Sequence, residues 1–145
     1  MSDVTIRSVL TKYRVVAVVG LSHNPEKASY GVAGYLKDHG YRIIPVNPKT
    51  NEVLGEKSHK SLLGMPVELQ RAVEIVDIFR PANEVPPIVE QAIQLGKAWG
   101  RPFVVWMQLG IVNEEAAAKA REAGLTVIMN HCMRQEHERL FSSFA

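Results

Sequence analysis

The sequence has 145 residues and a mass of 16.1 kDa, the usual size of one domain. Hydrophobic residues make up 46% and charged residues 22%, a balance that excludes an intrinsically disordered chain. No apolar run approaches the roughly 20 residues of a membrane span, and residues 1–11 lack the pattern of a signal peptide. The single cysteine, Cys132, excludes an internal disulfide and suits a reducing compartment. We therefore expect one cytoplasmic domain over residues 1–145, with no membrane partner.

The net charge of +2 is unevenly distributed. Residues 1–50 contain seven Lys or Arg and three Asp or Glu and so carry +4, whereas the remaining residues, with ten and twelve, carry −2. The basic residues are neither clustered nor interleaved with aromatic ones, so no nucleic-acid partner is expected. The pattern indicates that a bound anion would lie near the first third of the chain, although scattered surface charge is the simpler alternative.

Apolar β-branched runs alternate with segments of helical periodicity. We expect strands at residues 15–19, 41–46, 75–79, 103–107 and 125–129. The helices between them are expected over 29–39, from 85 to a stop at Gly96, and from a cap at Asn113 to a stop at Gly124. Residues 49–70 are less regular, with a short helix near 67–69, and residues 135–144 are expected to form a final helix.

This strict alternation predicts right-handed crossovers and a doubly wound α/β fold, with a five-stranded, mainly parallel sheet and helices on both faces. The predicted strand order is 3-2-1-4-5. Ligands of such sheets bind outside the carboxyl ends of the strands, where the order reverses. The candidate binding loops are therefore the five that follow Gly20, Val46, Phe79, Met107 and Met129.

The loop after the first strand offers groups suited to a phosphate. Gly20 ends a buried run and lets a ligand approach the backbone, and the N–H groups at the start of the next helix can hold an anion. Ser22, Lys27 and Ser29 add two hydroxyls and a cation. The segment matches neither G-x-G-x-x-G nor the P-loop, so a plain turn that caps its helix with Ser29 is an equal alternative.

The loop after the second strand is Asn47-Pro48-Lys49. An NAD site places an acidic residue here, about 20 residues after the glycines, to accept from the ribose hydroxyls. A lysine with no carboxylate suits a ribose that carries a phosphate, as in NADP or coenzyme A. A simple Asn-Pro turn with an exposed lysine is the alternative.

The next two loops add candidates of other kinds. Phe79 can lie against adenine or simply pack in the core, and Arg80 can form bidentate contacts with a phosphate. Trp106 is expected in the core. Gln108 and Gly110 are expected at the mouth of the site, where an amide can bond a ligand amide and glycine leaves room.

No catalytic centre or metal site is expected. Cys132 with His131 and His137 matches no zinc spacing, although a thiol near the ligand cleft is an alternative reading. The other histidines, His23, His39 and His59, are expected on the surface. The sequence has no Gly-x-Ser-x-Gly motif and no paired carboxylates at a strand end. A binding cleft is therefore better supported than a catalytic one.

Four stretches together resemble the CoA-binding domain family, which includes the N-terminal domain of the succinyl-CoA synthetase alpha subunit and its stand-alone relatives. They cover most of residues 14–140: VVAVVGLSHNPEKASYGVAGYLKDHGYRIIPVNPK, VDIFRP, VVWMQLGIVNEEAAAKAREAGLTVIMNHC and EHERL. The resemblance implies a Rossmann-like domain that binds coenzyme A or an acyl-CoA by its nucleotide half. The ligase's phosphorylated histidine belongs to a further domain, so the resemblance implies binding rather than thioester synthesis.

The resemblance also implies site residues. Gly20, Leu21 and Ser22 would meet the diphosphate, with Lys27 and Ser29 nearby, whereas Asn47, Pro48 and Lys49 would frame the ribose and its phosphate. Phe79, Arg80 and Pro81 would flank the adenine, and Gln108 and Gly110 would face the pantetheine arm. Leu21 departs from the alanine usual in such relatives, and Asn130-His131 from Asp-Arg. An NADP-dependent oxidoreductase and a nucleotide-sensing regulatory domain are the alternative functions.

Overall fold

The computed structural model describes residues 2–141. The parallel strands of the main sheet are β1 (Val15–Val19), β2 (Arg42–Val46), β5 (Ile75–Ile78), β6 (Val104–Met107) and β7 (Thr126–Met129). The helices are α1 (Asp3–Lys12), α2 (Ala28–Asp38), α3 (Val67–Gln70), α4 (Val85–Trp99), α5 (Glu114–Glu122) and α6 (Met133–Phe141), with a 3-10 turn at Ala82–Glu84. All five predicted strands and each predicted helix are confirmed, with ends that differ by a few residues. The tail helix is described as far as residue 141, and the rest of its predicted span lies outside the described residues.

The sheet has the order β2-β1-β5-β6-β7, and every neighbouring pair in it is parallel. The doubly wound α/β class is therefore confirmed, but the predicted order 3-2-1-4-5 is wrong. The third predicted strand, β5, pairs directly with β1, so the predicted strands follow the order 2-1-3-4-5. Right-handed crossovers permit either order, because handedness does not decide on which side of the first strand the third is added. The order thus reverses between β1 and β5.

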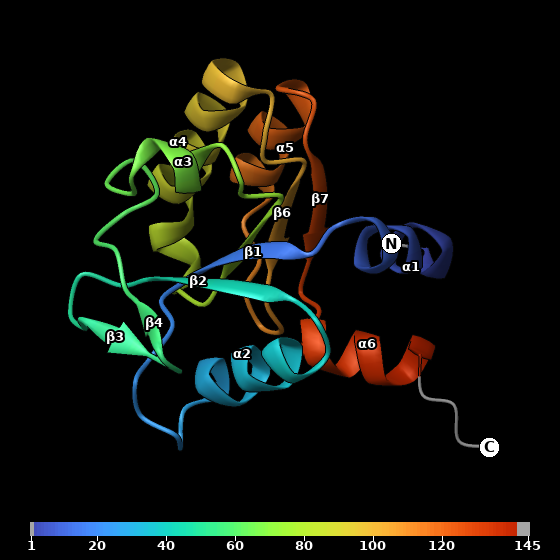
Figure 1. The fold of residues 1–145 in the computed structure, drawn as a ribbon. Helices are drawn as coiled ribbons and strands as arrows, with labels where there is room; N and C mark the ends of the chain where they lie inside the picture. Colours follow the sequence, from blue (N-terminus) through green and yellow to red (C-terminus); the bar gives the residue numbers. More distant parts are fainter. Residues whose placement is uncertain (1, 142–145) are drawn as a thin grey trace.

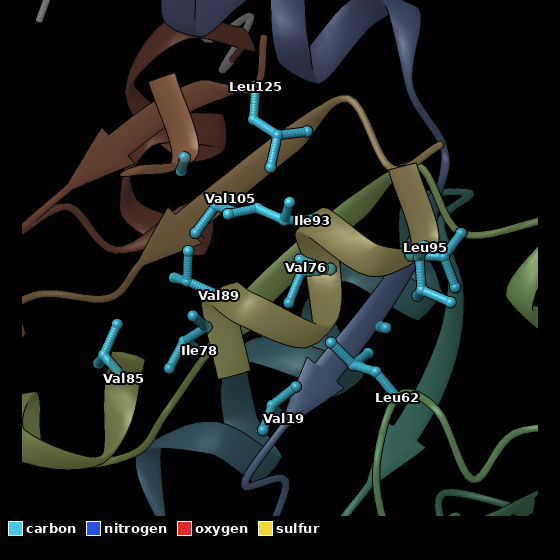
Figure 2. Close-up of a cluster of buried hydrophobic side chains, with 14 of the residues drawn as sticks. Val19, Leu62, Val76, Ile78, Val85, Val89, Ile93, Leu95, Val105 and Leu125 are labelled. Atoms are coloured by element: carbon cyan, nitrogen blue, oxygen red, sulfur yellow. The ribbon is translucent and has the colours of Figure 1, made fainter. Parts of the chain in front are cut away.

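Helices cover the sheet on both faces (Figure 1). On one face α4 and α5 pack on a core that includes Val76, Ile78 and Val105, whereas on the other α1, α2 and α6 pack on a second core that surrounds Trp106. Figure 2 shows side chains of α4 lying over the strands of the first core. Each fully buried aliphatic side chain stabilises the fold by about 1.5–3 kcal/mol.

Helix α1 was not predicted, although its sequence carries the signal. Ile6, Val9 and Leu10 have helical spacing and are buried against the sheet. The Ser2 hydroxyl caps the helix by accepting from the Thr5 N–H at 3.2 Å. A short amphipathic segment ahead of the first strand therefore completes the second core.

Residues 49–66 contain a small hairpin that periodicity did not indicate. Strands β3 (Glu52–Val53) and β4 (Glu56–Lys57) are antiparallel, and Leu54 and Gly55 between them both have positive φ, as a tight hairpin turn requires. The chain then returns to the main sheet, where His59 forms an isolated parallel bridge with Val46. This return positions the residues after His59 beside the carboxyl end of β2.

The predicted stop of helix α4 at Gly96 is wrong. The helix continues to Trp99 and is capped by Gly100. Gly100 has a φ of 75° and donates its N–H to the Gly96 carbonyl at 2.9 Å. Gly100, and not Gly96, is therefore the left-handed glycine that ends the helix. The predicted prolines do occupy the first turn of α4, and the Asn113 side chain caps α5 by accepting from the Ala116 N–H. Among the described helices, none combines the length and the apolar character needed to cross a bilayer.

Candidate ligand-binding site

Three loops meet at Gly20, where the strand order reverses. Gly20 has a φ of 89° and donates its N–H to the Val46 carbonyl at 2.8 Å. A Cβ atom at this position would lie 2.8 Å from both the Phe79 carbonyl oxygen and Arg80 Cδ. The absence of a side chain therefore lets the loop after β1 contact the loops after β2 and β5, at the edge where doubly wound sheets bind ligands.

A cavity of about 490 Å³ opens beside Gly20 on the α4 side of the sheet. Its volume is within the ~300–1,000 Å³ typical of small-molecule sites. Five predicted site residues line it: Gly20, Asn47, Pro48, Lys49 and Arg80. The other lining residues are Val19, Val46, Lys60, Ser61, Leu62, Asn83, Glu84, Pro87, Ile88 and Gln91. The cavity thus combines an apolar floor with a rim of amides and cations.

Asn47 fixes the geometry of two of these loops. Its Nδ2 donates to the Leu21 carbonyl at 3.0 Å, and its Oδ1 accepts from the Lys49 N–H at 2.9 Å. Both ends of the amide are therefore used within the protein. Asn47 therefore ties the loop after β1 to the loop after β2, and the Lys49 side chain is exposed.

Lys60 and Ser61 are cavity residues that sequence reasoning missed. They follow His59, whose carbonyl accepts from the Asn47 N–H at 2.8 Å and whose N–H donates to Pro45. Because this segment runs parallel to β2, the residues that follow it reach the same edge of the sheet. His59 itself was predicted on the surface but is buried, and burial, with Lys57 nearby, lowers its pKa. No periodicity marks this segment, so only the tertiary pairing reveals it.

The cations of the cavity differ in their partners. Arg80 is paired with Glu84: Nη2 donates to the two carboxylate oxygens at 2.8 and 3.0 Å, and Nε donates to one of them at 3.2 Å. Within residues 2–141, neither Lys49 nor Lys60 forms an ion pair. The two lysines are therefore the cations best placed to meet an anionic ligand.

The remaining predicted residues of the β1–α2 loop lie outside the cavity. Leu21 is fully buried in the second core, and the Ser22 N–H donates to the buried Ser29 hydroxyl at 3.0 Å. Lys27 is exposed and stands at the N-cap of α2 without a side-chain capping bond. Ser29 thus holds the loop rather than capping the helix.

Most of the predicted site residues after β5 and β6 do not line the cavity either. Phe79 is half-buried against the second core, and Pro81 is exposed at the start of the 3-10 turn. Gln108 is 3% exposed, and the N–H of exposed Gly110 donates to Asn130 Oδ1 at 2.7 Å. Trp106 is fully buried, as predicted.

Asp77 is a buried acidic residue within an apolar strand, and it was not among the predicted site residues. It lies on β5, in the middle of the sheet, and is fully buried. Gln108 Nε2 donates to its Oδ1 at 2.7 Å, whereas its Oδ2 has no partner among the described residues. Burial raises the pKa of Asp77 to about 7, against the opposing effect of the Gln108 hydrogen bond. The position of an acidic residue within the apolar run Ile75–Phe79 could have indicated from the sequence that this acid is buried.

The Cys132 region gives no metal site. Cys132 is half-buried, Nδ1 of His131 lies 3.4 Å from Glu136 Oε1, and His137 contacts Tyr35 instead. Across residues 2–141, no three His, Cys, Asp or Glu side chains are grouped so that they could hold a metal ion.

Comparison with known proteins places this arrangement in a family. The family model of the CoA binding domain matches residues 14–138, so the chain belongs to that family. YneT, an uncharacterised protein of Bacillus subtilis, is 38% identical over 136 residues, which are 94% of each chain. The crystal structure of Prb, the PH1109 protein redesigned for binding, shares 40% identity with a TM-score of 0.90, over 99% of this chain and 95% of that one.

Part of the chain is also similar to a much larger enzyme. The ADP-forming acetate–CoA ligase of Methanocaldococcus jannaschii is 35% identical over 81 residues. Those residues are 56% of this chain but only 11% of the ligase. The likeness confirms the expected relation to CoA ligases of this kind, and it is confined to one segment of the enzyme.

Proposed function

We propose that this protein binds coenzyme A or an acyl-CoA, with the nucleotide half in the cavity beside Gly20. The observation that carries the proposal is the position of this cavity at the reversal of strand order, with Lys49 and Lys60 on its wall and no ion pair to either within the described residues. Membership of the CoA binding domain family supports the same class of ligand.

The cavity offers separate surfaces for the parts of the nucleotide. Val46, Leu62 and Ile88 provide an apolar floor for the adenine. The diphosphate would cross the crevice at Gly20 toward the first turn of α2, where backbone N–H groups and Lys27 favour negative charge. A ligand so placed spans the point where the helices change faces of the sheet.

The 3′-phosphate is assigned to Lys49 and Lys60 rather than to Arg80. Glu84 already neutralises the Arg80 guanidinium, and its carboxylate would repel a phosphate placed beside it. The lysines face no such competition. The Arg80 side chain instead passes close to Gly20 and pairs with Glu84.

The proposed role is binding without a chemical step. Glu84 is the only acid among the residues that line the cavity, and Arg80 engages it. Among the described residues, the cavity lining includes no histidine or cysteine that could serve as a base or nucleophile. The protein would therefore sense, carry or present a CoA ligand.

Titration calorimetry with CoA and with dephospho-CoA tests this proposal. Removal of the 3′-phosphate should weaken binding at least roughly tenfold, because a charge-assisted contact contributes about 1.5–3 kcal/mol. Lys49→Ala and Lys60→Ala should each reduce the difference between the two ligands. Lys97→Ala, which removes an exposed lysine of α4 outside the cavity, is the matched control.

Other outcomes of the same titrations would contradict the proposal. Equal affinity for CoA and dephospho-CoA would remove the role of the two lysines. Tighter binding of NADPH than of CoA would favour an NADP-dependent oxidoreductase. If neither CoA nor NADPH binds, the cavity is not a site for these nucleotides and the proposal is wrong.

A further inference from the structure

The Asp77–Gln108 pair lies outside the nucleotide cavity. Asp77 is aligned with Val18 on one side and Trp106 on the other, so its side chain lies on the face covered by α1, α2 and α6. Gln108 follows β6 two residues after Trp106 and reaches the same face, diagonal to Asp77. An apolar side chain in the position of Asp77 would avoid the cost of burying a carboxyl with an unpaired oxygen. The pair therefore calls for a functional explanation.

The two ends of the Gln108 amide have different surroundings. Nε2 donates to Asp77 Oδ1 at 2.7 Å. Oε1 accepts no hydrogen bond from the described residues. Among those residues, the only side-chain polar atom that is both fully buried and without a hydrogen-bond partner is Asp77 Oδ2. Gln108 is 3% exposed at the carboxyl edge of the sheet, and Oε1 is the end of its amide that Asp77 does not engage. A carboxylate can only accept, so an ionised Asp77 forces the amide to keep its oxygen outward.

We propose that Asp77 is a positioning residue that acts through Gln108: it holds the amide so that Oε1 accepts a hydrogen bond from an amide N–H of the pantetheine arm. This inference rests on the proposed function. In this arrangement the nucleotide would occupy the α4 side of the crevice and the arm would pass to the α2 and α6 side, where Gln108 directly follows β6. Gln108 thereby distinguishes a ligand that carries the arm from a bare nucleotide.

The protonation of Asp77 controls the contact. Burial raises the pKa of Asp77 to about 7, and no charged side chain of α1, α2 or α6 contributes to this shift. Ionisable groups on these helices pair with one another instead, as Tyr35 does with His137 and Arg139 with Asp3 and Glu136. A protonated Asp77 can donate to the amide oxygen, which frees the amide to turn its NH₂ group outward. The hydrogen-bond acceptor at the mouth is then lost.

Calorimetry with CoA and with adenosine 3′,5′-bisphosphate, which lacks the arm, tests the inference. At pH 8, Gln108→Met should weaken CoA binding about fivefold and change the affinity for the bisphosphate by less than about twofold. Gln94→Met, on the exposed side of α4, is the matched control and should change neither affinity. Between pH 8 and pH 6, the preference of the wild type for CoA over the bisphosphate should fall by about twofold or more.

Asp77→Asn provides the second variant. Asparagine can pair with either orientation of the Gln108 amide, so the preference for CoA should be reduced at pH 8 and should no longer change with pH. A Gln108→Met protein that loses affinity for both ligands alike, or for neither, would overturn the inference, as would a preference that is constant with pH in the wild type. Failure of the wild type to bind either ligand would instead contradict the proposed function itself. If Asp77→Asn does not fold, the Gln108→Met and wild-type titrations decide the matter.

Discussion

Gly20 is a position in the site where any side chain would clash with neighbouring atoms. Alanine there would combine a φ of 89° with a Cβ 2.8 Å from the Phe79 carbonyl oxygen and Arg80 Cδ in the loop after β5. We expect Gly20→Ala to lower the free energy of unfolding by about 1–3 kcal/mol and to weaken CoA binding strongly. Chemical denaturation and calorimetry measure the two effects.

Gly124→Ala separates backbone strain from the loss of space. Gly124 has a φ of 90°, but nothing lies within 4 Å of the position its Cβ would take. This variant should lose stability through strain alone and bind CoA like the wild type. Equal effects of the two substitutions on binding would contradict the role given to the close approach at Gly20.

Asp77 makes the stability of the protein depend on pH. Its pKa is raised from 3.8 to about 7 by burial, so between these values the folded state binds a proton that the unfolded state has lost. The stability of the wild type should therefore fall as pH rises from 4 to 7, by as much as about 4 kcal/mol from this group. Asp77→Asn should remove this contribution, so that the variant gains stability relative to the wild type toward pH 8. Urea denaturation at several pH values checks this, and a difference that is constant with pH would contradict it.

At the scale of the element, the two glycines near the end of α4 should respond to alanine with opposite signs. Gly96 lies within the helix, and nothing is within 4 Å of its potential Cβ, so Gly96→Ala should stabilise the protein by about 0.5–1 kcal/mol. Gly100 has a φ of 75°, so Gly100→Ala should destabilise it by about 1–2 kcal/mol. Thermal unfolding of both variants measures the signs, and destabilisation by Gly96→Ala would show that the helix is interrupted there.

The elements that sequence could predict are those with strong local patterns. The run Val15–Val19 is uninterrupted and buried, and the spacing of Val85, Val89 and Ile93 matches one helical face. Gly96 was misread as a stop because a glycine alone does not reveal its φ. The strand order was mistaken for a different reason: the partners of β1 are chosen by tertiary packing, and the sequence of β5 is equally apolar for either neighbour.

The same distinction applies to the candidate site. Gly20, Lys49 and Arg80 could be placed at one edge of the sheet from sequence because the carboxyl ends of parallel strands meet there, and all three line the cavity. Lys60 was missed because its segment reaches that edge only through the bridge of His59 to Val46. The pairing of Arg80 with Glu84 also needs the 3-10 turn, which brings the carboxylate back to the guanidinium.

At the scale of the whole molecule, α6 joins the far end of the described chain to its beginning and to α2. Arg139 donates to both carboxylate oxygens of Asp3 at 2.9 and 2.8 Å, which ties α6 to α1. The Tyr35 hydroxyl lies 2.7 Å from His137 Nδ1, within hydrogen-bond distance, which ties α6 to α2. The same helix covers the core around Trp106, so its docking supports the face on which Asp77 lies.

Acid should loosen this docking. Burial lowers the pKa of His137, and His39 and Arg14 lower it further, so the unfolded chain takes up a proton more readily than the folded one. The contribution of His137 to stability is therefore lost as pH falls below about 6.5. His137→Gln should be less sensitive than the wild type to a change from pH 7.5 to pH 5.5, as measured by urea denaturation. His23→Gln, on the exposed β1–α2 loop, is the control, and identical pH responses of the His137→Gln and wild-type proteins would contradict the argument.

A crystal structure of the protein with coenzyme A tests the central claim most directly. We predict that the adenosine fills the cavity between Val46 and α4, that the diphosphate passes Gly20, and that the 3′-phosphate contacts Lys49 and Lys60. An empty cavity at saturating ligand, or a nucleotide bound at another surface, would contradict it.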